Sequence, residues 1–91
     1  MYLQQVSNQF KTDLKVYKND KKVINELKEV LHILSQDRVL PRKYKNHELK
    51  GEFKGIFECH VFPDVLLMYE KDQTNKVLRL VRLGSHAKLF E

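Results

Sequence analysis

Residues 55–84 read GIFECHVFPDVLLMYEKDQTNKVLRLVRLG and predict three antiparallel strands in a meander. At the start of this stretch apolar and polar residues alternate, as expected for a strand whose side chains project to two faces in turn. The nearly continuous apolar run over residues 65–69 predicts a central strand that is covered on both faces. Residues 77–83 predict the third strand, and Pro63-Asp64 and residues 72–75 are typical of the connecting turns.

The first half of the chain predicts one strand and two helices. Residues 2–6 are extended in character, and Phe10, Leu14 and Tyr17 then recur at the spacing of one helical face. A second helix ends before Pro41 and carries a wide apolar stripe. The members of this stripe are Val23, Ile24, Leu27, Val30, Leu31 and Leu34. We expect the two helices to form an antiparallel pair joined by a short turn.

The order strand, helix, helix and three strands predicts a small α+β domain that spans residues 1–91. We expect the two helices to pack on one face of a mostly antiparallel four-stranded sheet. Residues 86–90 should add a short C-terminal helical turn. Residues 38–54 carry many Lys and Arg residues without apolar periodicity, and they predict a basic connecting loop. The sheet face opposite the helices would then be a candidate active surface.

The charge of the chain favours a polyanionic partner. The formal net charge is +5 and the pI is about 9.4, which suits RNA, DNA or an acidic protein, although charge can also serve solubility alone. No apolar run approaches the ~20 residues that span a bilayer, and the first residues do not resemble a secretory signal. The single cysteine, Cys59, excludes an internal disulfide and fits a reducing cytoplasm. A buried apolar role is more typical of such a residue than nucleophilic chemistry.

Three histidines offer groups that can take and give protons near neutral pH. His60 follows Glu58 by two strand residues, so both side chains project from one face and the carboxylate could orient the ring. His47 lies in the basic loop, and His86 directly follows a break in the strand at Gly84-Ser85. Each histidine alone could be inert, either solvated in a loop or placed behind an N-cap serine. Their gathering around one sheet favours chemistry.

RNA cleavage is a reaction that such a set can perform. A base takes the proton of a ribose 2′-OH, the oxygen attacks the adjacent phosphorus, and an acid protonates the departing 5′-oxygen. Arg82, Lys50 and Lys54 could stabilise the developing charge; alternatively, Arg82 forms a surface ion pair and the lysines are solvated. Asp64 could orient a histidine, accept a proton or simply start a turn. Phe90 could stack on an unpaired base or pack the terminal turn.

A metal site would be a competing use of the same residues. His47, His60, Asp64 and His86 could supply four ligands. The chain has no His-x3-His or Cys-x2-Cys spacing. We therefore expect acid–base chemistry without a metal or another cofactor.

Three ordered segments resemble the YafQ branch of the RelE/ParE toxin superfamily. They are HELKGEFKG at residues 47–55, ECHVFPDVLLMY at residues 58–69 and VRLGSHAKLF at residues 81–90. These segments match the family pattern H-x-L-x-G-x-(W/F)-x-G, E-C-H-x2-P-D-x-L-L-x-Y and R-L-G-(S/T)-H-x2-L-F, whereas the helical half agrees only in length and order. Many relatives carry Trp in place of Val65, and often in place of Phe53 as well. The first difference could weaken base stacking or change sequence preference without removing a proton-transfer group.

The resemblance implies a RelE-like fold and a bacterial type II toxin, a ribosome-dependent endoribonuclease that cuts translated mRNA without a metal. It implies a cytoplasmic protein neutralised by a cognate antitoxin, with the free toxin a monomer and the antitoxin complex a higher-order assembly. It assigns catalysis to His47, His60, Asp64 and His86, and a part in activity to Phe90. On chemical grounds we expect His86 to be the general acid and His60 or His47 to be the general base.

Three other functions are compatible with this kind of chain. A noncatalytic module would occupy RNA or the ribosome and stop translation while the mRNA stays intact. A ParE-like toxin would act on DNA gyrase through protein contacts, and its histidines would be dispensable. An inactive relative would serve only as a corepressor bound to antitoxin, and the presence of all four candidate catalytic positions disfavours it.

Overall fold

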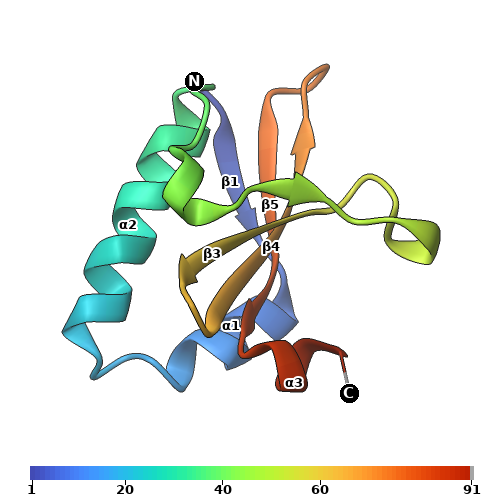
Figure 1. The fold of residues 1–91 in the computed structure, drawn as a ribbon. Helices are drawn as coiled ribbons and strands as arrows, with labels where there is room; N and C mark the ends of the chain where they lie inside the picture. The colour runs from blue at the N-terminus through green and yellow to red at the C-terminus, as the bar shows by residue number, and fades with distance from the viewer. Residues whose placement is uncertain (91) are drawn as a thin grey trace.

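The computed structural model describes residues 1–90, so Glu91, the last residue of the predicted domain, lies outside the described residues. The elements are β1 (Leu3–Val6), α1 (Asn8–Lys15), α2 (Lys21–Ser35), the 3₁₀ turn η1 (Arg42–Tyr44), β2 (His47–Glu48), the 3₁₀ turn η2 (Gly51–Phe53), β3 (Phe57–Phe62), β4 (Val65–Asp72), β5 (Val77–Gly84) and α3 (His86–Phe90). The predicted α+β class, the meander and the terminal helical turn are confirmed (Figure 1). Across residues 1–90, no helix has both the length and the apolar character needed to cross a membrane.

The sheet has five strands in the order β1-β5-β4-β3-β2, so the prediction of four strands is wrong. The additional strand is β2, inside the segment predicted as a loop, where His47 pairs with Glu58 and Glu48 pairs with Phe57. A strand of two residues is too short to show periodicity in the sequence. β1 pairs with β5 in parallel and the other neighbours are antiparallel. The sheet is therefore mostly antiparallel, as predicted.

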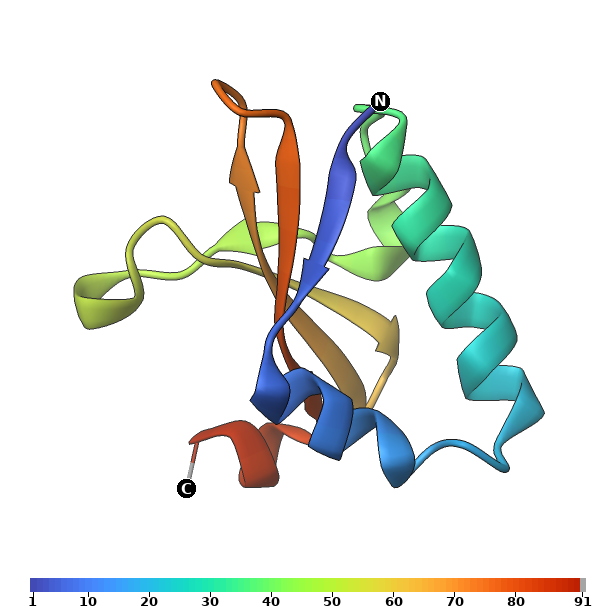
Figure 2. The same cartoon turned by 180° about the vertical axis from the view of Figure 1, so that it is seen from behind.

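The two N-terminal helices pack on the sheet and do not form the predicted antiparallel pair. α1 contacts β5, and α2 contacts β3. In Figures 1 and 2, α2 rises along the sheet while α1 lies across its lower end. Asp20 starts α2 by accepting a hydrogen bond from the Val23 N–H at 3.2 Å. Each helix buries its apolar face against the sheet, which leaves little reason for the helices to pair with each other.

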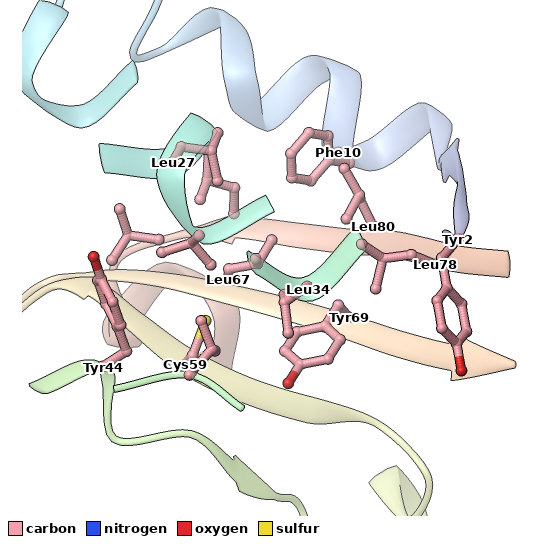
Figure 3. Packing of buried hydrophobic residues seen from close by; sticks show 14 residues of the cluster. Tyr2, Phe10, Leu27, Leu34, Tyr44, Cys59, Leu67, Tyr69, Leu78 and Leu80 are labelled. Atoms are coloured by element: carbon pink, nitrogen blue, oxygen red, sulfur yellow. The ribbon is translucent and has the colours of Figure 1, made fainter. Parts of the chain in front are cut away.

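The core lies between the helices and one face of the sheet (Figure 3). Its helical part contains Phe10, Leu27, Val30 and Leu34. The strands β3, β4 and β5 contribute Cys59, Val61, Leu67, Tyr69, Leu78, Leu80 and Leu83. Burial raises the pKa of the Cys59 thiol to about 12. Cys59 therefore fills the core as a neutral thiol, in agreement with the role predicted for it.

Candidate functional site

The register of the sheet brings three of the predicted site residues, His47, His60 and Arg82, to the face opposite the core. Directly paired strand residues project from the same face. One row on this face runs across β2, β3, β4 and β5 through His47, Glu58, Met68 and Arg82. The next row runs across β3, β4 and β5 through His60, Leu66 and Gly84. At a strand spacing of about 4.8 Å, the Cα atoms of His60 and Gly84 are about 10 Å apart, and α3 begins with His86 two residues later.

One buried carboxylate lies between two of the predicted histidines. The Glu58 side chain is only 6% exposed, and its Oε1 atom is 3.5 Å from His47 Nε2 and 4.0 Å from His60 Nε2. These distances are longer than a hydrogen bond, so the contacts are electrostatic and become ion pairs when a ring is protonated. Glu58 Oε2 is buried and has no hydrogen-bond partner within residues 1–90.

The backbone before β2 fixes the ring of His47. Lys45 has a left-handed conformation with φ of 48°, and its carbonyl oxygen is 2.9 Å from His47 Nδ1. Because a carbonyl oxygen can only accept, Nδ1 carries a proton in this contact, and the neutral ring keeps its lone pair on Nε2. The side chain of His47 is 51% exposed and that of His60 is 26% exposed. A substrate can therefore reach both rings.

His60 also lines a hollow of about 380 Å³ between α2, η1 and β3. Lys43 and Lys45 line the same hollow, together with the apolar residues Phe62 and Pro63. Both lysines lie within residues 38–54, the predicted basic loop, but they were not predicted as site residues. Only the packing of η1 on β3 brings them to His60.

A second group of site residues gathers around α3. The ring centroids of His86 and Phe90 are 4.9 Å apart, and Phe53 of η2 contacts Phe90 edge to face at 6.1 Å. Lys50 and Lys54 flank η2 and line a common hollow of about 300 Å³. Phe53 belongs to this group although it was not predicted as a site residue. Its position as the aromatic residue of the first matching segment was the available signal.

Arg82 is held by a buried ion pair with Asp13 of α1. Its Nε donates to Asp13 Oδ2 at 2.8 Å and its Nη2 donates to Oδ1 at 3.3 Å. Burial alone would raise the pKa of Asp13, but hydrogen bonds from Arg82, the Leu83 N–H and Gln9 lower it. The Arg82 side chain is 27% exposed. The ion-pair alternative for Arg82 is thus present, with a carboxylate partner that is buried, and a catalytic part for this residue stays a prediction.

Asp64 occupies the Pro63-Asp64 turn, which joins the paired residues Phe62 and Val65. It is exposed, and its charge adds to burial in raising the pKa of Tyr17, a residue that follows α1. No ion pair joins Asp64 to a histidine within residues 1–90. The turn-forming role is therefore present, and the catalytic role of Asp64 stays a prediction.

The four residues weighed as metal ligands are dispersed over the fold. Among residues 1–90, no group of three or more His, Cys, Asp or Glu side chains is arranged to hold a metal ion. His86 lies on α3 and Asp64 in the β3–β4 turn, whereas His47 and His60 share the carboxylate of Glu58.

Comparisons with known proteins agree on one family. The family model for the bacterial toxin YafQ of type II toxin–antitoxin systems matches residues 2–91. The mRNA interferase toxin YafQ of Escherichia coli strain K12 is 40% identical over 85 residues, which cover 92% of this chain and 90% of that protein.

Solved structures show the same fold over the whole described chain. A metal-bound toxin from Helicobacter pylori has a TM-score of 0.90 and 40% identity, covering 99% of this chain and 100% of that chain. The crystal structure of the E. coli DinJ-YafQ complex contains a chain with a TM-score of 0.87 and 36% identity, with 100% of both chains covered.

Proposed function

Since this chain belongs to the YafQ family of bacterial type II toxins, we propose that it is an mRNA interferase that cuts translated mRNA on the ribosome. The observation that carries this proposal is the pair of accessible histidines, His47 and His60, on a sheet face where β5 ends at Gly84, two residues before His86. β4 separates His60 on β3 from the end of β5 that leads to His86, and we propose that the scissile phosphodiester lies between these two rings. The net charge of +5 favours a polyanionic substrate.

The proposed reaction uses the 2′-hydroxyl of the RNA itself. His60 or His47 removes the 2′-OH proton, and the oxygen forms a bond to the adjacent phosphorus. The bond from phosphorus to the 5′-oxygen breaks, and His86 donates the proton that this oxygen needs to leave. The products are a 2′,3′-cyclic phosphate and a 5′-hydroxyl. Asp64 is proposed to assist proton transfer once RNA is bound, as the family resemblance implies.

Charged and aromatic side chains around α3 are proposed to hold the RNA. Lys50 and Lys54 line one exposed hollow beside Phe53, where they can neutralise phosphate charge. Phe90 is 36% exposed and can still stack on an unpaired base. The exposed part of the Arg82 guanidinium can add charge stabilisation to the phosphorane oxygens.

We propose a cognate antitoxin as the protein partner, because the E. coli relative was crystallised in the DinJ-YafQ complex. An acidic segment that folds on the basic surface would mask the site by charge complementarity. Ribosomes and translated mRNA as targets place the activity in the cytoplasm. Chemistry without a metal is part of the proposal, although the similar H. pylori toxin is described as metal-bound.

The test is to express the protein under tight control and to map mRNA 5′ ends beside a His60→Ala/His86→Ala double variant. We expect new in-frame ends in translated messages, and none with the variant. Growth arrest without new ends would contradict the nuclease. In that case a block in replication would point to gyrase, and a block in translation to ribosome occupancy.

The chemistry is tested with purified ribosomes programmed with a short mRNA. A 2′-deoxy nucleotide at the scissile position should abolish cleavage, and the unmodified message should give a 2′,3′-cyclic phosphate. Cleavage should persist when EDTA is added to chelate other metal ions while the free magnesium that ribosomes need is kept constant. Cleavage of the deoxy message would rule out attack by the 2′-oxygen.

A further inference from the structure

We infer that Glu58 is a positioning residue that holds His47 and His60 as one pair around a single carboxylate oxygen. The inference rests on the cleavage proposed above and assigns a part in it to a residue that is not among its proton-transfer groups. His47 comes from β2 and His60 from β3, yet both Nε2 atoms face Glu58 Oε1, at 3.5 and 4.0 Å.

The backbone accounts for this arrangement. His47 and Glu58 are directly paired between β2 and β3, and His60 is two residues beyond Glu58 on the same face. The whole of β2 is His47–Glu48, so its pairing serves chiefly to bring His47 beside this carboxylate. The carbonyl of Lys45 fixes the other ring nitrogen of His47 at 2.9 Å. His47 thus has its Nδ1 fixed by a hydrogen bond and its Nε2 facing the carboxylate.

Burial decides what Glu58 can do. With a side chain that is 6% exposed, Glu58 does not meet RNA and must act through the rings. Whichever histidine takes a proton becomes a cation beside a carboxylate that little water screens, and this attraction favours the charged intermediate. One carboxylate oxygen faces both rings, so it can stabilise a proton on either histidine.

The second carboxylate oxygen of Glu58 indicates that this residue does not serve to stabilise the fold. Glu58 Oε2 is buried without a hydrogen-bond partner within residues 1–90, which is unfavourable for folding. Its cross-strand neighbour Met68 shows that an apolar side chain fits the same row of the sheet. A residue that weakens the fold at a site lined by histidines is typical of a functional position.

The test compares Glu58→Gln, which keeps the shape and removes the charge, with Glu70→Gln. Glu70 is a surface carboxylate of β4 paired with Arg79 at 3.1 Å and serves as the matched control. Cleavage of ribosome-bound mRNA in single turnovers should fall roughly 10- to 100-fold for Glu58→Gln, as when carboxylates that orient metal-binding histidines are removed. Its affinity for the ribosome and its unfolding midpoint should stay at or above those of the wild type. Glu58→Met, which introduces the same side chain as its neighbour Met68, should behave alike.

Two further measurements separate positioning from a merely structural role. The ring ¹⁵N NMR signals of His47 and His60 should both change in Glu58→Gln and stay unchanged in Glu70→Gln. In a His47→Ala/His60→Ala background, Glu58→Gln should reduce cleavage no further. A wild-type rate in Glu58→Gln, or a loss of activity that follows a loss of folding, would overturn the inference.

The NMR measurement keeps the two proposals distinguishable because it needs no RNA. Wild-type protein that fails to cut mRNA would overturn the proposed function. Unchanged ring signals in Glu58→Gln, together with intact wild-type cleavage, would overturn only the part assigned to Glu58.

Discussion

Asp13 and Glu58 are both buried carboxylates, and their surroundings are opposite. Asp13 accepts hydrogen bonds from Arg82, Gln9 and the Leu83 N–H at 2.8–3.3 Å. Glu58 has no contact of that quality, with histidine nitrogens at 3.5 and 4.0 Å from one oxygen and no partner for the other within residues 1–90. The α1–β5 edge is thus built for stability, whereas the β2–β3 edge keeps a carboxylate that the described residues leave unsatisfied, beside two reactive histidines.

The reason for this difference lies in how each sheet edge is covered. β1 pairs with β5 only over residues 77–80, and the α1 region covers the rest of that edge. The Ser7 hydroxyl donates to the Val81 carbonyl at 2.8 Å, and Asp13 accepts from the Leu83 N–H at 2.9 Å. At the opposite edge β2 is two residues long, and the rings of His47 and His60 stay accessible there while Glu58 between them is buried.

Among the variants that test the difference between Asp13 and Glu58, Asp13→Ala should have the largest effect on stability. This change leaves the Leu83 N–H and the Arg82 guanidinium without their acceptor, and the free energy of unfolding should fall by roughly 3 kcal/mol. Urea unfolding followed by circular dichroism measures it, with Glu70→Ala in an exposed ion pair as control at about 0.5 kcal/mol or less. If the Asp13→Ala protein were as stable as the control, Asp13 would not stabilise the α1–β5 edge.

Arg82→Ala should lower the free energy of unfolding by about 2 kcal/mol. The effect is smaller than that of Asp13→Ala because Asp13 keeps its hydrogen bonds from Gln9 and the Leu83 N–H. The variant also tests where Arg82 belongs. Under conditions where the variant is fully folded, single-turnover cleavage should fall if Arg82 stabilises the transition state as proposed. An unchanged rate would show that Arg82 only stabilises the α1–β5 edge and takes no part in cleavage.

Acid should reduce the stabilisation that Asp13 gives to the α1–β5 edge. The pKa of Asp13 is lower in the folded protein than its ordinary value of 3.8. Its stabilisation is therefore complete above that value and is lost as the pH falls through the folded pKa. Unfolding free energies measured from about pH 5 down to pH 2 should fall less steeply for Asp13→Asn than for the wild type. Parallel curves would contradict this assignment.

On the reactive side, Phe53→Ala should reduce cleavage more than it reduces stability. The edge-to-face contact with Phe90 contributes about 1 kcal/mol and holds α3, which carries His86, against η2. Phe53→Trp, which keeps an aromatic ring at this position, is the control and should keep full activity. Equal cleavage by both variants would show that this contact does not position the site.

The smallest effect is expected for Lys50→Ala/Lys54→Ala. Both lysines are exposed, so stability should be unchanged while ribosome affinity weakens. The slope of log affinity against log salt should decrease by up to about 2 if each lysine neutralises one phosphate. Salt dependence equal to that of the wild type would exclude both residues from the RNA contact.

The sequence predicted those parts of the fold that repeat. The alternation over residues 57–62 follows from the alternating direction of strand side chains, and the apolar run over residues 65–69 follows from burial of both strand faces, so the meander could be predicted. The apolar stripe of α2 was predicted for the same reason. The direction of α1 relative to α2 and the two-residue strand β2 depend on tertiary packing, which leaves no local pattern.

The site divides in the same way. The spacing of two residues between Glu58 and His60 placed both on one face, as observed. His47 lies beside the same carboxylate only because β2 pairs with β3. The partner of Arg82 lies 69 residues away in the chain, and the sequence could suggest an acidic partner but not which one.

The most direct test measures cleavage and stability together on wild-type protein and the His60→Ala/His86→Ala variant. Single-turnover cleavage of ribosome-bound mRNA gives the chemistry, and urea unfolding gives the stability. We predict that cleavage falls by at least about 10²-fold while the free energy of unfolding changes by less than about 1 kcal/mol. Wild-type cleavage by the double variant would contradict the claim that this face of the sheet carries the reaction.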